Sequence, residues 1–184
     1  PTLPTAVFFP GDHGPMLIGA AAAEALIDGE EGRYMRALKS VLGAPLFHDP
    51  RPVGRRRLTV AEIVTSFLSL VKARAEKQAG LRFDRVLSGR PVHFHPDPAR
   101  DAQAEADLRA CYLAAGFAEV DFMAEPEAAA LAARGLGREE ELGMIVDIGG
   151  GTSDFSIFRI KGGEAEIIAS PGIRLGGTDF DQAA

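Results

Sequence analysis

The sequence VDIGGGTSD, residues Val146–Asp154, is the most informative stretch of this 184-residue chain. An apolar segment that predicts a β-strand runs into three glycines, with the carboxylate of Asp147 before them and the hydroxyl of Thr152 after them. Glycines let the backbone approach a polyphosphate and turn successive N–H groups toward its oxygens. A carboxylate beside such a turn suits a hydrated magnesium ion. The stretch therefore predicts a phosphate-binding turn, with a plain glycine-rich hairpin turn as the alternative.

Two other segments carry related signals. Residues 124–130, AEPEAAA, place Glu125 at the end of a predicted strand and a proline at the start of a helix of small residues. Residues 175–181, LGGTDFD, contain a second glycine turn with capping-box spacing after it. Taken singly, both segments are typical of ordinary helix starts.

The remaining chain predicts alternating strands and helices. Thr59 and Glu62 form a capping box at the start of a long amphipathic helix. Asp97 and Pro98 mark the start of another helix. The order of elements from Arg85 onward predicts an α/β sheet with crossovers. The expected elements are strands at 7–9, 16–18, 85–90, 119–124, 142–148, 155–160 and 165–168, helices at 19–28, 34–42, 99–115 and 126–134, and a loop at 44–57.

Composition excludes several classes of protein. The formal net charge of −6 argues against a dedicated nucleic-acid binder, which needs a basic surface. No segment approaches the roughly 20 apolar residues of a membrane span, so we expect no membrane partner. The single cysteine, Cys111, cannot form an internal disulfide and is interpreted as a small apolar residue on a helix. These features fit a cytoplasmic protein.

The three motif segments occur in the order and approximate spacing of the DnaK-type heat-shock chaperone ATPases, which the chain resembles. Residues 147–154 match that family's second phosphate loop, 125–130 its Glu-Pro helix start and 176–181 its Gly-Gly-x-Asp-Phe-Asp segment. Residues 16–22 and 37–43 resemble two further segments, so the likeness covers almost the whole chain. The resemblance implies an incomplete actin-like, ribonuclease H-like α/β fold.

The resemblance also implies domain organisation and residue roles. Residues 1–84 would belong to the N-terminal lobe, and 85–184 would carry the second phosphate loop. The cofactors would be ATP and Mg²⁺. Lys39 would lie near the γ-phosphate, Glu125 would orient water or the magnesium shell, and Asp147 would support the metal. Backbone donors and nucleotide contacts would come from Gly149, Gly150, Gly151, Thr152, Asp154, Gly176 and Gly177, with Thr152 also in a catalytic role.

Departures from the family pattern suggest a branch. Residues 88–94, SGRPVHF, look more like the YegD-like branch, whose members generally lack the peptide-binding part. His93 and His95 alternate without an evident third ligand, so we expect no metal there. The family's first phosphate loop and its adenosine loop have no counterpart in this sequence. We therefore expect this piece alone to be inactive and to bind ATP weakly.

The predicted function is that of an ATP-binding and ATP-hydrolysing domain of a chaperone-like protein, in which nucleotide drives a movement of lobes. Its expected partners are ATP or ADP, client proteins and cochaperones. Two alternatives stay open at this point: an actin-like, MreB-type filament-forming ATPase, and a nucleotide-binding module without hydrolysis. The segment around Lys39 and the Asp-Phe-Asp sequence at 179–181 favour the chaperone.

Overall fold

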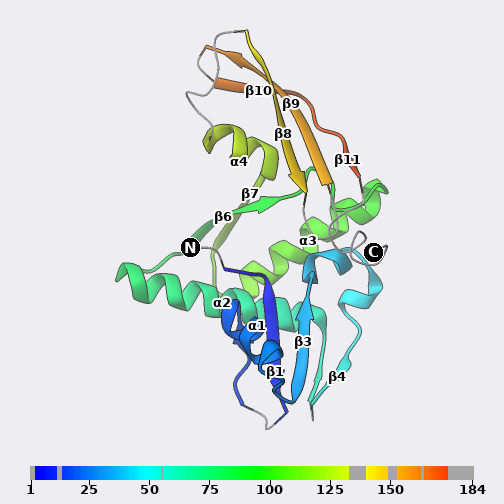
Figure 1. The fold of residues 1–184 in the computed structure, drawn as a ribbon, viewed down its shortest axis with the longest axis vertical. Coiled ribbons are helices and arrows are strands. Elements are labelled where there is room, and N and C mark those ends of the chain that lie inside the picture. Colours follow the sequence, from blue (N-terminus) through cyan, green and yellow to red (C-terminus); the bar gives the residue numbers. More distant parts are fainter. Residues whose placement is uncertain are drawn as a thin grey trace. The chain divides into compact units, whose positions relative to one another are not determined.

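A computed structural model of the chain is shown in Figure 1. The residues that it describes are 3–11, 14–54, 56–132, 140–148, 153–162 and 164–173. The chain divides into two compact units, of which unit 1 comprises Pro1–Val86 and Asp97–Val120, and unit 2 comprises Leu87–Pro96 and Asp121–Ala184.

Unit 1 begins with a small antiparallel sheet of order β2-β1-β3. Strand β1 (Ala6–Pro10) lies between β2 (Leu17–Ile18) and β3 (Gly32–Arg36), and helix α1 (Ala20–Ile27) packs on all three strands. Ala6, Phe8, Ala22 and Ala25 form the buried cluster between helix and sheet. The predicted first hairpin and first helix are confirmed.

The helix predicted at 34–42 is wrong. Its first part is strand β3, in which Tyr34 and Met35 pair with Phe8 and Val7 of β1. Ala37 then adopts a left-handed conformation with φ 55°, which ends the strand, and only a short 3-10 turn η1 (Leu38–Val41) follows. Pairing with β1 satisfies the backbone groups of β3 and lets Tyr34 pack against the buried cluster, which outweighs the helical propensity of the segment.

The predicted loop at 44–57 contains regular structure. A 3-10 turn η2 (Pro45–Phe47) is followed by the antiparallel strands β4 (Arg51–Val53) and β5 (Arg56–Leu58). Phe47 is fully buried and anchors the segment. The prolines and arginines of this segment leave no helical or strand-like alternation of apolar residues. The hairpin could therefore be recognised only from its backbone pairing.

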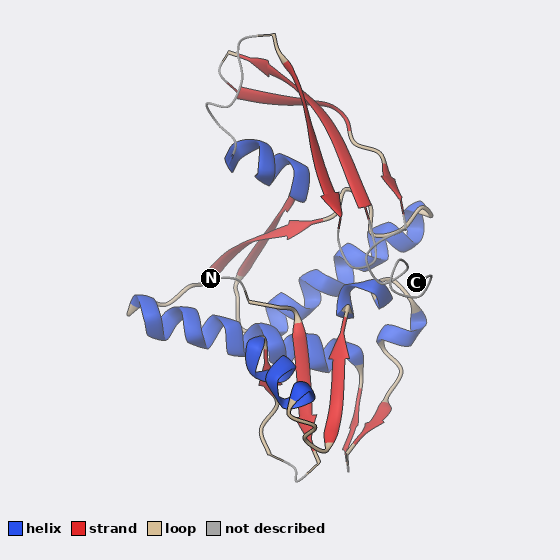
Figure 2. Cartoon of the chain, viewed as in Figure 1, coloured by secondary structure: helices blue, strands red, loops and turns tan. Residues whose placement is uncertain are grey.

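Two long helices complete unit 1, and α2 packs against α3 (Figure 2). Helix α2 (Val60–Ala79) starts at the predicted capping box and buries the predicted apolar stripe. Helix α3 (Pro98–Ala114) starts at Asp97, whose carboxylate accepts from the Arg100 N–H at 2.9 Å. Both helices are confirmed as predicted. Because α3 packs on α2, residues 97–120 belong with the N-terminal part of the chain rather than with the residues that surround them in sequence.

Strands β6 (Arg85–Arg90) and β7 (Glu119–Ala124) pair with each other, and the chain passes from one unit to the other within them. Unit 2 continues with helix α4 (Glu125–Ala132) and the strands β8 (Leu142–Ile148), β9 (Ser153–Lys161), β10 (Glu164–Ala169) and β11 (Gly172–Ile173).

The sheet of unit 2 is centred on β9. Strand β8 pairs with one edge of β9, while β10 and β11 pair with successive parts of its other edge, all antiparallel. Helix α4 packs against β8, β9 and β10. The predicted hairpin of β9 and β10 is confirmed. Among the described residues β8 pairs with β9 and not with β6 or β7, so the strands from Arg85 onward form two sheets instead of one.

No helix among the described residues is long and apolar enough to cross a membrane.

Candidate functional site

Lys39 lies in unit 1, within the 3-10 turn η1. Its side chain is exposed, whereas Leu38 and Leu42 on either side of it are 4% and 6% exposed. The two leucines anchor the turn in the core and leave the ammonium group at the surface.

Glu125 lies in unit 2 as the first residue of α4, directly after β7. Its side chain extends over Gly89 of β6, because a Cβ added at Gly89 would lie 3.5 Å from Glu125 Cγ and 3.9 Å from its Oε1. Pro126, the second residue of the helix, is buried. The strand–helix junction therefore holds a half-buried carboxylate at the end of the β6–β7 pair.

Asp147 lies near the end of β8, and its side chain is exposed. Its Cα partner on β9 is Asp154, and the next pair toward the strand ends is Ile148 with Ser153. Strand β8 leads into the triglycine segment and β9 leads out of it, and the paired ends of the two strands are adjacent. The triglycine segment itself, with Thr152, lies outside the described residues.

The predicted site residues therefore fall into three groups. Glu125, Asp147 and Asp154 belong to unit 2, and Lys39 belongs to unit 1. Their convergence on one ligand stays a prediction. Those outside the described residues are Gly149, Gly150, Gly151, Thr152, Gly176 and Gly177.

The chemistry of Asp147 is compatible with a magnesium ion that keeps most of its water ligands. Within the part of the chain that the structure describes, no three His, Cys, Asp or Glu side chains gather into a group that could hold a metal. Magnesium does not require such a group, because it is usually held by one or two carboxylates together with water and phosphate oxygens. The exposed carboxylate of Asp147 beside the triglycine segment is a donor of that kind.

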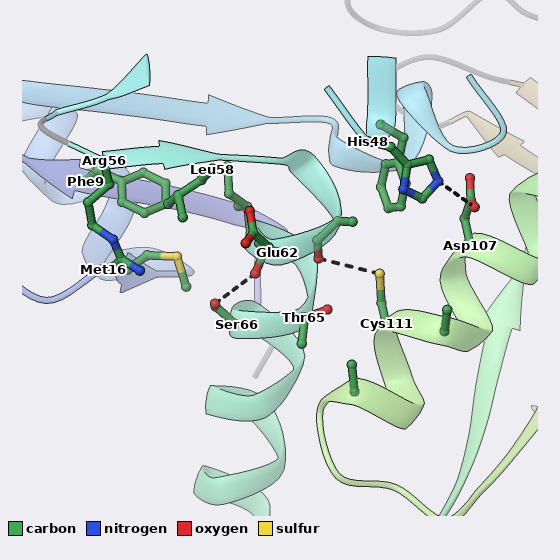
Figure 3. Close-up of a pocket in the computed structure, with 15 residues that line it drawn as sticks. Phe9, Met16, His48, Arg56, Leu58, Glu62, Thr65, Ser66, Asp107 and Cys111 are labelled. Atoms are coloured by element: carbon green, nitrogen blue, oxygen red, sulfur yellow. Dashed lines mark hydrogen bonds and ion pairs between the residues drawn. The ribbon is translucent and has the colours of Figure 1, made fainter. Parts of the chain in front are cut away.

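Unit 1 also contains a pocket of about 510 Å³ that the sequence did not predict. Figure 3 shows Phe9, Met16 and Leu58 toward one end of the pocket and His48 with Asp107 at the other. The ring nitrogen Nε2 of His48 lies 3.0 Å from Asp107 Oδ1. The one sequence signal for this pair was an acid on the core-facing side of α3, where Ala104, Asp107, Leu108 and Cys111 are buried together.

Cys111 lies in the wall of the same pocket, between α3 and α2 (Figure 3). Its thiol is buried and lies 3.6 Å from the Ala61 carbonyl oxygen, to which it donates. Burial raises the pKa of the Cys111 thiol, a hydrogen bond with Thr65 opposes the rise, and the nearby Asp107 carboxylate adds to it. The thiol is therefore held in its neutral form, as expected of a packing residue.

Comparison with known proteins gives a consistent picture. A family model described as Hsp70 protein matches residues 49–184. The chain is 34% identical over 184 residues to the chaperone protein DnaK of Thermosipho melanesiensis, with 98% of the chain and 29% of the relative covered. It is 35% identical to DnaK of Thermotoga petrophila, covering 92% of the chain and 27% of the relative.

A plant relative is similar over a shorter stretch. The heat shock 70 kDa protein BIP3 of Oryza sativa subsp. japonica is 38% identical over 131 residues, which cover 69% of the chain and 18% of the relative. The chain thus spans less than a third of the length of these curated relatives.

Proposed function

The chain belongs to the Hsp70 protein family, and from this premise we propose that it forms part of an ATP-binding and ATP-hydrolysing domain of a chaperone-like protein. The observation that carries the proposal is the family match over residues 49–184, which contain Glu125, Asp147 and the triglycine segment. Lys39 lies before that match but within the stretch aligned with the DnaK relatives. Nucleotide-driven movement of lobes, with client proteins and cochaperones as partners in the cytoplasm, is part of the same proposal.

The pairing of β8 with β9 supports a phosphate-binding role for the segment between them. Because Ile148 and Ser153 are Cα partners, the strands hold both ends of the triglycine segment close together. Glycines held at such a point can direct backbone N–H groups at phosphate oxygens. We assign Gly149–Gly151 and Thr152 to the phosphates, Asp154 to the placing of phosphate and water, and Gly176 and Gly177 to the nucleotide.

Three side chains are proposed to act on the terminal phosphate. Asp147 would hold a water-coordinated Mg²⁺, which when bound neutralises the charge of the phosphate oxygens. Glu125, held over Gly89 at the strand–helix junction, would orient the attacking water or the water shell of the ion. Lys39 would stabilise the charge that develops on the phosphate oxygens as a point charge. Phosphoryl transfer requires mainly such positioning and electrostatics.

The test uses the full-length protein and measures steady-state ATP hydrolysis. Lys39→Ala and Asp147→Asn should each lower kcat by at least about 100-fold, because the first removes the positive charge at the reacting phosphate and the second weakens the hold on the magnesium ion. Lys77→Ala and Glu166→Gln remove exposed charges of the same kinds elsewhere in α2 and β10 and should leave kcat unchanged. Unchanged turnover in Lys39→Ala and Asp147→Asn would contradict these roles.

Two further measurements decide between this proposal and its alternatives. Tight ATP binding by calorimetry without turnover in the unmodified protein would indicate a nucleotide-binding module that does not hydrolyse. ATP-dependent sedimentation of the protein as polymers would indicate a filament-forming ATPase instead of a chaperone.

A further inference from the structure

The segment that follows Lys39 is tied to helix α3 by one buried carboxylate. The Gly43 N–H donates to Asp107 Oδ2 at 3.0 Å, and His48 Nε2 lies 3.0 Å from Asp107 Oδ1. Gly43 precedes the 3-10 turn η2 and His48 ends it. A single side chain of α3 therefore holds this stretch of chain at both ends, as Figure 3 shows for His48.

Asp107 is buried, so its carboxylate depends on these hydrogen bonds. The side chain is 4% exposed, and a third partner, Gln103 Nε2, donates to Oδ1 at 2.8 Å. A buried carboxylate that loses its hydrogen-bond partners is strongly destabilised, because water cannot replace them. Movement of the segment from Gly43 to His48 away from α3 would remove two of the three partners, so the position of the segment is coupled to Asp107.

Close packing at Gly43 restricts the segment further. The residue has φ 72°, and a Cβ added there would lie 2.3 Å from the Arg100 carbonyl oxygen. The backbone therefore lies directly against the first turns of α3. On the other side of Lys39, the left-handed Ala37 and the buried Leu38 fix the entry into the turn.

We propose that Asp107 is a positioning residue for Lys39. By holding Gly43 and His48 against α3, its carboxylate fixes the backbone from which the Lys39 side chain extends. The inference rests on the proposed function, in which Lys39 acts at the terminal phosphate of ATP. A lysine ammonium on a flexible stem acts well only from a fixed anchor, and a misplacement of about 1 Å in a catalytic group can cost about 100-fold in rate.

The experiment is a double-mutant cycle in the full-length protein, measured as kcat and KM for ATP. Asp107→Ala should lower kcat by about tenfold or more and change KM less than about twofold, because the contact places a group for the chemical step. In the Lys39→Ala background the same substitution should have no further effect on kcat. Asp107→Asn keeps an oxygen that can accept from the Gly43 N–H, so it should recover most of the lost kcat.

Cys111→Ala provides the matched control. Cys111 is buried on the same face of α3, one turn beyond Asp107, and contacts α2 instead of the Lys39 segment. Its substitution should leave kcat unchanged in both backgrounds. Amide hydrogen exchange gives a second readout: Asp107→Ala should speed exchange at Gly43 and within residues 38–48, whereas Cys111→Ala should not.

The possible failures are distinguishable. A fall in kcat that is the same with and without Lys39 would overturn the positioning role and leave the proposed function intact, as would unchanged kcat and unchanged exchange in Asp107→Ala. Unchanged turnover in Lys39→Ala itself would overturn the role of the lysine in the proposed function, and with it any catalytic consequence of Asp107.

Discussion

Gly43 and Gly29 form a natural pair for separating backbone strain from close packing. Both have a left-handed backbone, with φ 72° and 71°. A Cβ at Gly43 would lie 2.3 Å from a carbonyl oxygen of α3, whereas a Cβ at Gly29 would meet nothing within 4 Å. The left-handed backbone therefore favours glycine at both positions, and the close contact with α3 adds a second reason at Gly43 alone.

Alanine at these two positions should destabilise the full-length protein unequally. Gly29→Ala should cost about 1–2 kcal/mol, the price of a left-handed conformation with a Cβ. Gly43→Ala should cost that amount and about 1–3 kcal/mol more, because the added methyl group overpacks the contact with α3. The midpoints of urea unfolding measure the difference, and equal shifts for both variants would contradict the close approach at Gly43.

Residue identity alone did not reveal Asp107. An acid on a helix is normally solvated, and only its place between Ala104, Leu108 and Cys111 on the buried face indicated otherwise. Its partners Gly43 and His48 are 64 and 59 positions away in the sequence. No local pattern predicts a contact over that separation.

Among the elements, helix α2 begins with two reciprocal hydrogen bonds between Thr59 and Glu62. The Glu62 N–H donates to Thr59 Oγ1 at 3.0 Å, and the Thr59 N–H donates to Glu62 Oε2 at 2.7 Å. Thr59→Ala removes the first bond and should cost about 0.5–2 kcal/mol. Ser66→Ala, in the exposed middle of the same helix, removes a bond to the Glu62 carbonyl oxygen and should cost little. Thermal unfolding of both variants measures the contrast, and equal losses would contradict the capping role.

The same cap makes the stability of α2 depend on pH. The Thr59 backbone N–H, and then its hydroxyl group, hold the pKa of Glu62 below the ordinary value for glutamate. A lowered pKa in the folded state means that the contribution is present above the pKa of the unfolded chain and is lost as the pH falls through that of the folded state. Glu62→Gln should therefore lower the urea midpoint at pH 7 and have a smaller effect near pH 3. An equal effect at both pH values would show that the charge of Glu62 is not involved.

Elements with local signals were predicted correctly, and elements without them were not. Helices α2 and α3 have capping residues and an apolar face, and strands β8 and β9 flank the triglycine sequence. Strand β3 has helical composition and became a strand because β1 offered it a partner. Whether a segment follows its local propensity or pairs with a distant strand depends on that strand, so the sequence of the segment alone does not decide it.

At the scale of the whole molecule, the sheet of unit 2 has an exposed apolar face. Leu142, Met144, Val146 and Ile148 alternate along β8 and are between 45% and 64% exposed. Gly143 and Ile145, on the other face, are half-buried, and a Cβ at Gly143 would meet the Phe158 ring at 2.2 Å. An apolar face of this kind is a site of contact with another segment or, in an isolated piece, of aggregation.

The isolated 184-residue chain should therefore self-associate, which sedimentation velocity at increasing concentration would detect. Met144→Lys should reduce association with little effect on stability, because the side chain is 64% exposed and a charge there opposes contact. Gly143→Ala should instead lower stability, because its methyl group would enter the packed face. A monomeric chain at high concentration, or association unchanged by Met144→Lys, would contradict this role of the face.

The fold class predicted from the sequence, an actin-like, ribonuclease H-like α/β fold with a mixed sheet and flanking helices, is confirmed by the family match, and the described strands form several small sheets. By itself the sequence also determined the starts of α2 and α3, the strands around the triglycine segment and the place of Glu125 at the junction of β7 and α4. These features depend on neighbours a few residues apart, so local chemistry is enough to specify them.

Only the tertiary structure decided that residues 32–36 form a strand, that the Glu125 side chain extends over Gly89, and that Asp107 holds the chain after Lys39. Each of these depends on backbone or side-chain groups that are distant in sequence and meet only when the chain is folded. The burial that makes the Asp107 contacts strong is likewise a property of the assembled core.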